Sequence, residues 1–480
     1  MGTVEEHFLH PFFHPGTVAI VGATSNALKI NFQLFENLVR RDFGGKAYPV
    51  NPNTKEILGT KTYPTLRDIP DELDLVVSAV PFPATLGVVK ECVERNVKRM
   101  VIVTGGFSDG GPEGKLAHGE IARLTREGGI RVLGPNTLSP INTSNNLAIS
   151  FHHVGELIRG GVSFIFQSGM YEYKFPGLLS HLGICKIIDL GNKMDINEVD
   201  ALEYLREDPE THVIAMHVES IRGDGRRFME VLKTTSSRKP VVILKSGRTL
   251  SGSRAAASHT GSIAQENDLV LDDLLRQAGA FRAHNLEEFF DFAKAFEFLI
   301  PPSNNRIAVV GISGGEGVIA IDACEENGFR LAEVGEAAFN RVKHLFPPWV
   351  IPVNPFDFGV SMQFHADISP NEAIGTLFSM LDDDNVDCML MQAPSLLFQR
   401  ASVWLPQSTV LSLMDATVAA IARVKEKGKP LALWQCSAMD SIENEFVRKL
   451  ELQRVPIFPS ATRATRALSA LLTYKNIRSM

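Results

Sequence analysis

The stretch Thr17-Val18-Ala19-Ile20-Val21-Gly22-Ala23-Thr24-Ser25-Asn26 decides the fold class, because a run rich in β-branched residues leads directly into a small glycine turn. A run of this kind followed by a longer helical stretch, here residues 32–41, is typical of one strand and one helix of a parallel sheet. The alternation continues through four further runs, at residues 47–51, 74–81, 99–104 and 130–136. These runs predict a parallel, doubly wound sheet for the first part of the chain.

Two more series of apolar runs follow the first. The second series comprises residues 161–166, 185–191, 212–220 and 239–247, and the third comprises residues 306–313, 387–392, 430–435 and 455–460. Between them, residues 301–305 (PPSNN) break both the helical and the strand period, which indicates a linker. We therefore predict an α/β protein of three domains, with boundaries 1–148, 149–302 and 303–480.

Length and composition agree with this division. The chain has 480 residues, and about 150 residues per domain predicts three domains. It is 44% hydrophobic and 21% charged with a net charge of −7, which is typical of a globular protein and excludes a general attraction to nucleic acid or anionic membranes.

The same sequence predicts a cytoplasmic protein without a metal site. The sequence contains no run of about 18 apolar residues, which is the length needed to span a bilayer. The first residues, MGTVEEHFLHPFFHPG, are acidic and broken by prolines, unlike a signal peptide. The five cysteines form no Cys-x-x-Cys pair, which disfavours disulfides and a thiolate zinc site.

The glycine turn at Gly22 is a candidate ligand site, because a turn between a strand and a helix presents backbone N–H groups to a phosphate. A dinucleotide fingerprint would need two further glycines there and an acidic residue about 20 positions on, and neither is present. A nicotinamide cofactor is therefore disfavoured, while a plain turn without a ligand stays open. Further Gly and Pro turns end the other strands at Pro81, Gly105-Gly106 and Asn136, and their convergence favours a long ligand that carries phosphate.

The second series carries a candidate nucleophile. His259 lies in a loop of small residues, between Ser258 and Thr260-Gly261, so little bulk would shield its ring. A histidine nucleophile needs one bare nitrogen and an acceptor for the other, and Glu219, at the end of residues 212–219, could supply that acceptor. Two alternatives stay open. His259 could be structural, and Glu219 could cap a turn or pair with one of three arginines, Arg222, Arg226 or Arg227.

Several of these segments together resemble the NDP-forming acyl-CoA synthetases, relatives of the succinyl-CoA synthetase α subunit. The similar segments are VAIVGATS (18–25), YPVNPNTKEILGTKTYPTL (48–66), VTGGFSDGG (103–111), IRVLGPNTLSPIN (130–142), HVESIRGDGRRF (217–228) and KSGRTLSGSRAAASHTGS (245–262). The resemblance covers nearly the whole chain. It implies a Rossmann-like CoA-binding domain, then a flavodoxin-like domain that bears a phosphohistidine, then a third flavodoxin-like domain.

The resemblance also implies residue roles. It makes His259 the phosphorylated residue and Glu219 the carboxylate that holds it. The implied CoA contacts are Gly22, Ser25, Asn51, Pro52, Lys55, Val80, Pro81, Gly105, Gly106 and Phe107. The implied phosphate site comprises Gln167, Ser168, Gly169, Ser258, Thr260 and Gly261. The candidates for the substrate pocket are Asn136, Met170, Tyr171 and Asn192. The chain departs from the family at 27–31 and at 170–173, where the family usually has a glycine-containing segment and small residues, respectively.

The implied function is that of an acid–CoA ligase subunit that couples thioester formation reversibly to ATP/ADP and phosphate. No segment is left for the family's ATP-grasp domain, and no P-loop is present. A separate ATP-grasp β subunit is therefore expected to carry ATP/ADP and Mg²⁺ in a hetero-oligomer. The organic acid is not specified. Two alternatives are a catalytically silent CoA-binding scaffold and, less favoured, an NAD-dependent oxidoreductase.

Overall fold

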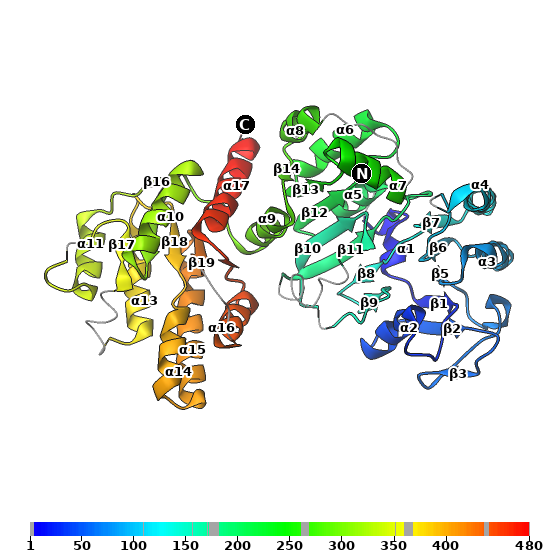
Figure 1. Ribbon diagram of the computed structural model, residues 1–480, viewed down its shortest axis with the longest axis horizontal. Helices are drawn as coiled ribbons and strands as arrows, with labels where there is room; N and C mark the ends of the chain where they lie inside the picture. The colour runs from blue at the N-terminus through cyan, green and yellow to red at the C-terminus, as the bar shows by residue number, and fades with distance from the viewer. Residues whose placement is uncertain are drawn as a thin grey trace. The chain divides into compact units, whose positions relative to one another are not determined.

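The structure is a computed structural model that describes residues 4–479 except 109, 156, 170, 172–181, 261–267, 351, 360–367 and 436–440. Internal contacts divide the chain into two compact units, Met1–Phe289 and Phe290–Met480 (Figure 1). Each unit is described by itself below.

The first sheet of the unit Met1–Phe289 is parallel, with its strands in the order β2-β1-β5-β6-β7. These strands are β1 (Thr17–Val21), β2 (Lys46–Val50), β5 (Leu75–Ser78), β6 (Arg99–Ile102) and β7 (Arg131–Leu133), and a small hairpin, β3 (Glu56–Ile57) with β4 (Thr60–Lys61), follows β2. The chain leaves β1 for β2 on one side and returns to β5 on the other, so the strand order reverses between β1 and β5. Open α/β sheets bind ligands at such a reversal, beyond the carboxyl ends of the strands.

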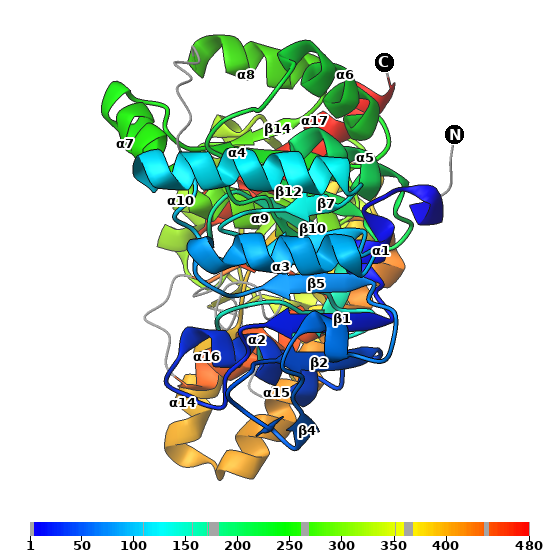
Figure 2. The ribbon, with the colours of Figure 1, turned by 90° about the vertical axis from the view of Figure 1, so that its right-hand side faces the viewer.

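Helices cover both faces of this sheet. Two of them, α3 (Phe82–Glu94) and α4 (Gly111–Glu127), lie side by side over one face (Figure 2), where Val89 and Ile121 pack on strand residues such as Val76. The opposite face packs against α2 (Ile30–Arg40) and the N-terminal helix α1 (His10–Phe13).

The second sheet of this unit has the order β14-β13-β12-β10-β11-β8-β9. Its parallel strands are β10 (Arg159–Phe166), β11 (Ile184–Asp189), β12 (Val213–Val218), β13 (Val241–Lys245) and β14 (Phe281–Ala283). The hairpin of β8 (Ile141–Asn142) and β9 (Leu147–Ala148) pairs antiparallel with β11, so residues before the predicted boundary at 148 extend this second sheet. Its strand order reverses between β10 and β12, which gives a second switch point.

The helices of the second sheet are α5 (Glu198–Glu207), α6 (Gly225–Ser236), α7 (Leu250–Thr260), α8 (Asp268–Gln277) and α9 (Leu286–Phe298). Asn197 caps α5 by accepting the N–H of Val199 at 2.8 Å, and Asp224 caps α6 by accepting that of Arg226 at 2.9 Å. Both caps satisfy donors that have no partner within the helix. Leu202 of α5 and Val231 of α6 then pack on one face of the sheet, in the same core cluster as Ile20 of β1.

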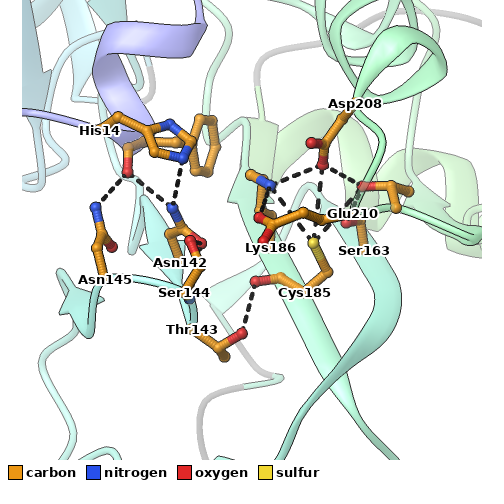
Figure 3. Close-up of polar contacts among 12 residues, drawn as sticks. His14, Asn142, Thr143, Ser144, Asn145, Ser163, Cys185, Lys186, Asp208 and Glu210 are labelled. Atoms are coloured by element: carbon orange, nitrogen blue, oxygen red, sulfur yellow. Dashed lines mark hydrogen bonds and ion pairs between the residues drawn. The ribbon is translucent and has the colours of Figure 1, made fainter.

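A buried charged cluster lies at the amino edge of the second sheet (Figure 3). Lys186 of β11 is fully buried, and its Nζ lies 2.7 Å from Asp208 Oδ2 and 3.2 Å from Glu210 Oε2. Beside it, Asn142 and Asn145 donate to the carbonyl of Phe13 at 2.9 Å, which fixes the end of helix α1 against the β8–β9 hairpin.

The unit Phe290–Met480 contains a third parallel sheet, of order β16-β15-β18-β19-β20 with β17 beside β15. Its strands are β15 (Arg306–Gly311), β16 (Arg330–Leu331), β17 (Phe356–Asp357), β18 (Cys388–Gln392), β19 (Leu431–Trp434) and β20 (Ile457–Phe458). Helices α10 (Gly314–Glu326) and α17 (Ala461–Ser479) pack on one face. The other face is covered by α11 (Glu336–Val342), α13 (Pro370–Phe378), α14 (Ser395–Trp404), α15 (Gln407–Ala422) and α16 (Ser441–Leu452).

The three sheets, whose main strands are parallel, confirm the predicted α/β class, and a strand overlaps every quoted apolar run. Residues 301–305 form neither helix nor strand, as predicted. The division into compact units falls within α9 rather than at 302, and the boundaries 1–148, 149–302 and 303–480 stay a prediction. Among the described residues, no helix combines the length and the apolar character needed to cross a bilayer.

Candidate active site

The first switch point is formed by the glycine turn after β1 and the end of β5. The backbone N–H of Gly22 donates to the carbonyl of Val50 at 3.0 Å, and that of Ala79 donates to Val21 at 2.8 Å. Gly22 has a φ of +90°, and a methyl group there would lie 3.0 Å from Val80 Cγ1 and 3.1 Å from the Ala79 carbonyl oxygen. The position therefore requires glycine, and the absent side chain leaves the turn open for a ligand's backbone contacts.

Side chains join the neighbouring strand ends at this edge. Asn51 donates from Nδ2 to the Ala23 carbonyl at 2.7 Å and accepts the N–H of Asn53 at 2.8 Å, which ties the end of β2 to the glycine turn. Thr104 donates from Oγ1 to the Val80 carbonyl at 3.0 Å and likewise ties the end of β6 to β5.

Most of the predicted CoA contacts lie along this edge with access to solvent. Four of them are exposed, namely Ser25, Pro52, Lys55 and Pro81, and so is Asn136, a candidate for the substrate pocket. Phe107 differs, since its side chain is completely buried and packs edge-on against Phe82 at 6.1 Å between ring centroids. Only the backbone of the turn around Gly106 can therefore face a ligand. The roles of all these residues stay predictions.

At the second switch point, Gln167 holds the strand end that carries Glu219. Its Oε1 accepts the backbone N–H of Glu219 at 2.9 Å and that of Ser220 at 3.3 Å, and its Nε2 lies 3.4 Å from Ser220 Oγ. The Gln167 carboxamide is therefore engaged with the protein, and the N–H groups of the turn that follows it stay the candidate donors for a phosphate.

Two buried lysines support the same strand end from other sides. Lys245, the last residue of β13, donates from Nζ to the carbonyl of Glu219 at 2.8 Å. Lys193, in the turn after β11, donates to the carbonyl of Ser220 at 2.6 Å and pairs with Glu198 Oε2 at 3.1 Å. The two carbonyl groups that follow the Glu219 side chain are thereby fixed by charged donors, which form stronger hydrogen bonds than neutral ones.

Asp189 is a buried carboxyl beside Glu219. Its Oδ2 accepts the N–H of Leu138 at 2.8 Å and its Oδ1 accepts that of Gly191 at 3.1 Å. Burial, with a smaller contribution from the nearby Glu219 carboxylate, raises the pKa of Asp189 to about 7 against the opposing effect of the two backbone donors. Asp189 therefore changes its charge near neutral pH.

Tyr171 packs against strand residues of this site. Its ring stacks on Phe166 at 3.9 Å with an interplanar angle of 6°, and it meets the ring of His217 edge-on at 5.3 Å. Burial and the charge of Glu219 raise the pKa of the Tyr171 hydroxyl. Burial, with Lys245 and Lys193, lowers the pKa of His217 to about 4, so His217 is neutral at neutral pH. Tyr171 is 1% exposed, so it belongs to the packed support of the site, and its role in a substrate pocket stays a prediction.

The prediction that His259 lies in a loop is wrong, because the structure places it in helix α7, where the run of small residues with alanines at 255–257 continues a regular helix. Ser258, His259 and Thr260 belong to the last turn of α7, which follows β13. Gly261 and Met170 lie outside the described residues, as do the side-chain environments of Ser258, His259 and Thr260.

The carboxyl edges of the two sheets are joined by backbone contacts between the turn after β7 and the turn after β11. Asn192 donates its N–H to the Pro135 carbonyl and Met194 donates to that of Gly134, both at 2.8 Å. Arg131 adds an ion pair with Asp195 at 2.7 Å. The turn that presents Asn136 at the first edge and the turn that presents Asn192 at the second are thus parts of one junction.

Sequence reasoning missed four charged residues of this site, namely Asp189, Lys193, Glu198 and Lys245. All four are at least nine-tenths buried. The position of a charged residue at the end of an apolar strand run, or just after one, was a usable signal. Such a residue is seldom buried unless it has a partner, so its position predicts a buried polar contact. Their partners come from segments 20 or more residues away in most cases, and the sequence alone does not identify them.

Comparison with known proteins agrees with this geometry. Residues 16–142 match the family described as "CoA binding domain", and residues 159–296 match "Succinyl-CoA ligase like flavodoxin domain". Two domains of these types, with the carboxyl edges of their sheets joined, define the class of CoA-binding chains that share the domains of succinyl-CoA ligase.

Three relatives narrow the class. The α subunit of acetate–CoA ligase [ADP-forming] II from Pyrococcus furiosus is 34% identical, over 91% of this chain and 92% of that protein. Acetate–CoA ligase [ADP-forming] II from Archaeoglobus fulgidus is 31% identical, over 98% of this chain and 67% of that protein. The solved structure of "dinucleotide forming" acetyl-coenzyme A synthetase 1 from Ca. Korarchaeum cryptofilum, in complex with phosphate and ADP, is 33% identical with a TM-score of 0.82, and covers 98% of this chain and 97% of that one.

The chain belongs to the family of ADP-forming acetate–CoA ligases and corresponds to their α subunit. This confirms the family expected from the sequence motifs.

Proposed function

We propose that this chain is the CoA-binding and phosphate-carrying subunit of a reversible ADP-forming acid–CoA ligase. The observation that carries the proposal is the junction of the carboxyl edges of the two sheets, through which the edge with the predicted CoA contacts and the edge with Glu219 are held in one compact unit. Family membership supports the same reaction class.

The reaction is proposed to run through two covalent carriers. A nucleotide transfers its terminal phosphoryl group to a ring nitrogen of His259, with release of ADP. The substrate carboxylate then takes the phosphoryl group from His259 and becomes an acyl phosphate. Finally the CoA thiol attacks the acyl carbon, loses its proton, and displaces phosphate to give the thioester. Covalent carriers of this kind divide one difficult step into easier ones.

Glu219 is the proposed orienting carboxylate for His259. Its backbone is fixed by Gln167 and Lys245, so its side chain is presented from a rigid strand end. A carboxylate that accepts the N–H of one ring nitrogen fixes the tautomer and stabilises the imidazole as it gains positive charge. The turn at Ser168 and Gly169 is proposed to donate backbone N–H groups to the phosphoryl oxygens.

A separate subunit is proposed to supply the nucleotide. The relative from Pyrococcus furiosus is named as a subunit alpha, and this chain matches 67% of the longer relative from Archaeoglobus fulgidus, which leaves a further part of that protein unmatched. We propose that the partner is an ATP-grasp β subunit that binds ATP/ADP and Mg²⁺, in a cytoplasmic hetero-oligomer. Because the named relatives are acetate–CoA ligases, acetate is the first acid to test.

The test is to label the native complex with γ-³²P-ATP. The wild-type chain should acquire a phosphoryl group that is labile to acid, and His259→Asn should acquire none while it still binds CoA in calorimetry. His212→Asn is a matched control, since it removes an exposed histidine just before β12 in the same sheet, and it should label normally. Label on His259→Asn would refute the phosphohistidine. A wild-type chain that binds CoA but takes no label would instead indicate the scaffold alternative.

A further inference from the structure

Lys193 is a buried cation at the junction of the two carboxyl edges. Its side chain is 3% exposed, in the turn that follows β11. The Nζ atom has two acceptors among the described residues, the Ser220 carbonyl at 2.6 Å and Glu198 Oε2 at 3.1 Å. One of these acceptors belongs to the residue next to Glu219, so the ammonium group directly supports the strand end that carries the carboxylate.

The partner of Lys193 is equally buried and is also connected to this strand end. The Glu198 side chain is 0% exposed and accepts the backbone N–H of Arg222 through its other oxygen. Arg222 in turn donates from Nη1 to the Asn192 carbonyl at 3.1 Å. The Lys193–Glu198 pair therefore forms hydrogen bonds with the segment after Glu219 at two residues, Ser220 and Arg222.

The turn that carries Lys193 is fixed on its other side by the first domain. The N–H groups of Asn192 and Met194, on either side of Lys193, donate to Pro135 and Gly134 at 2.8 Å. Lys193 has a φ of +51°, a conformation that side chains other than glycine adopt at a cost. The surrounding contacts thus hold a non-glycine residue in an unfavourable backbone conformation, as is common where a side chain must be delivered to one place.

We propose that Lys193 is a positioning residue for phosphoryl transfer, because it fixes the strand end bearing Glu219 relative to the turn that adjoins the CoA-binding edge. The inference rests on the proposed function, in which Glu219 holds His259. Lys193 acts through its side-chain contacts with Ser220 and Glu198, whereas backbone N–H groups hold the first domain's turn. Its removal is therefore expected to disturb Glu219 and to leave the CoA-binding edge in place.

Burial of this pair does not by itself separate a positioning role from a structural one. Buried ion pairs contribute little to stability relative to apolar residues of similar volume, since both charges lose their hydration. The same sheet offers a comparison in the Lys186–Asp208 pair at its amino edge, which is just as buried and has an Nζ–Oδ2 distance of 2.7 Å (Figure 3). Lys186 and Asp208 lie away from both carboxyl edges, so this second pair serves as a matched control.

The experiment compares Lys193→Met, the double variant Lys193→Met/Glu198→Gln and the control Lys186→Met/Asp208→Asn, each in the native complex. The double variants remove both charges of a pair, so neither leaves a buried charge alone. The measurements are the rate of ³²P transfer from γ-³²P-ATP to the chain, normalised to the folded fraction, and kcat and KM for CoA with acetate as the acid.

The Lys193→Met/Glu198→Gln variant should label about 100-fold more slowly, the loss expected when a distant change misplaces a catalytic group by about 1 Å. Its kcat should fall with the labelling rate, while the KM for CoA stays within about twofold. The control pair should label at the wild-type rate. Lys193→Arg retains a cationic donor and should recover part of the lost rate.

Three results would overturn the inference. A folded Lys193→Met/Glu198→Gln variant that labels at the wild-type rate would show that Lys193 positions nothing needed for transfer. An equal loss in the Lys186→Met/Asp208→Asn control would reduce the effect to general damage to the sheet. A wild-type complex that takes no label at all would remove the proposed function, and this inference with it, whereas the first two results leave the phosphohistidine intact.

Discussion

Substitution of Asp189 by asparagine should change how the stability of the first unit depends on pH. The folded pKa of Asp189 is about 7, raised above its ordinary value of 3.8 by burial and then by Glu219. Below pH 3.8 both folded and unfolded chains hold the proton. As the pH rises toward 7, the unfolded chain loses the proton while the folded chain keeps it, so the free energy of unfolding falls. Above pH 7 both are ionised and the loss is complete.

The size of the effect follows from the shift. Each pH unit between the two pKa values costs about 1.4 kcal/mol, so the wild-type chain should lose about 3 kcal/mol from Asp189 between pH 5 and pH 7. Asparagine has no such dependence. Asparagine can accept only one of the two N–H bonds, from Leu138 or Gly191, which should destabilise the variant by about 1–3 kcal/mol at pH 5.

The assay is the melting temperature of wild type and Asp189→Asn, measured in parallel from pH 5 to pH 8. The variant should melt lower at pH 5, and the gap should close or reverse by pH 8, a relative change of roughly 6–12 °C for a unit of this size. Taking the difference between the two proteins cancels the other titrating groups. A gap that stays constant over this range would refute a raised Asp189 pKa. Glu219→Gln should move the wild-type transition to lower pH, since it removes a charge that raises this pKa.

Three further substitutions test the two carboxyl edges and the buried Lys186–Asp208 pair. Gly22→Ala places a methyl group 3.0 Å from Val80 Cγ1 at a φ of +90°, and it should cost about 1–3 kcal/mol and abolish CoA binding in calorimetry. Unchanged CoA affinity would contradict the assignment of that turn. Glu219→Gln should lower ³²P labelling of the complex by about 10²–10⁴-fold while the melting temperature moves by a few degrees, and normal labelling of a destabilised variant would make Glu219 structural. Lys186→Met leaves Asp208 buried without its cation, and it should cost about 3–5 kcal/mol in urea unfolding, with a smaller loss counting against a desolvated pair.

The strands of the fold could be predicted because each one is a local signal. β-Branched runs such as residues 17–21 mark strands wherever they occur, and glycine turns such as Gly22 mark where strands end. The pairing of strands is a longer-range matter. The antiparallel pairing of residues 141–148 with the second sheet has no local signal in the sequence. It depends on β11, a distant strand whose backbone hydrogen bonds are available on one side.

The candidate site divides in the same way. His259, Glu219 and Gln167-Ser168-Gly169 were identified from motifs, because the chemistry of phosphoryl transfer restricts residue types over short segments. The buried charged residues that support Glu219 were not identified from motifs. Asp189 acquires its raised pKa from burial and from Glu219, 30 residues further along the chain, and neither influence exists until the strands are paired.

The sequence by itself therefore determined the α/β class, the family and the residues that carry the proposed chemistry, since these depend on short-range pattern and residue type. Only the tertiary structure decided which groups support them. Parallel pairing brings the carboxyl ends of distant strands to one edge, and burial there removes water from Asp189, Lys193 and Glu198. Electrostatic interactions strengthen as water is excluded, so the properties of these charged groups belong to the folded arrangement rather than to any segment of the chain.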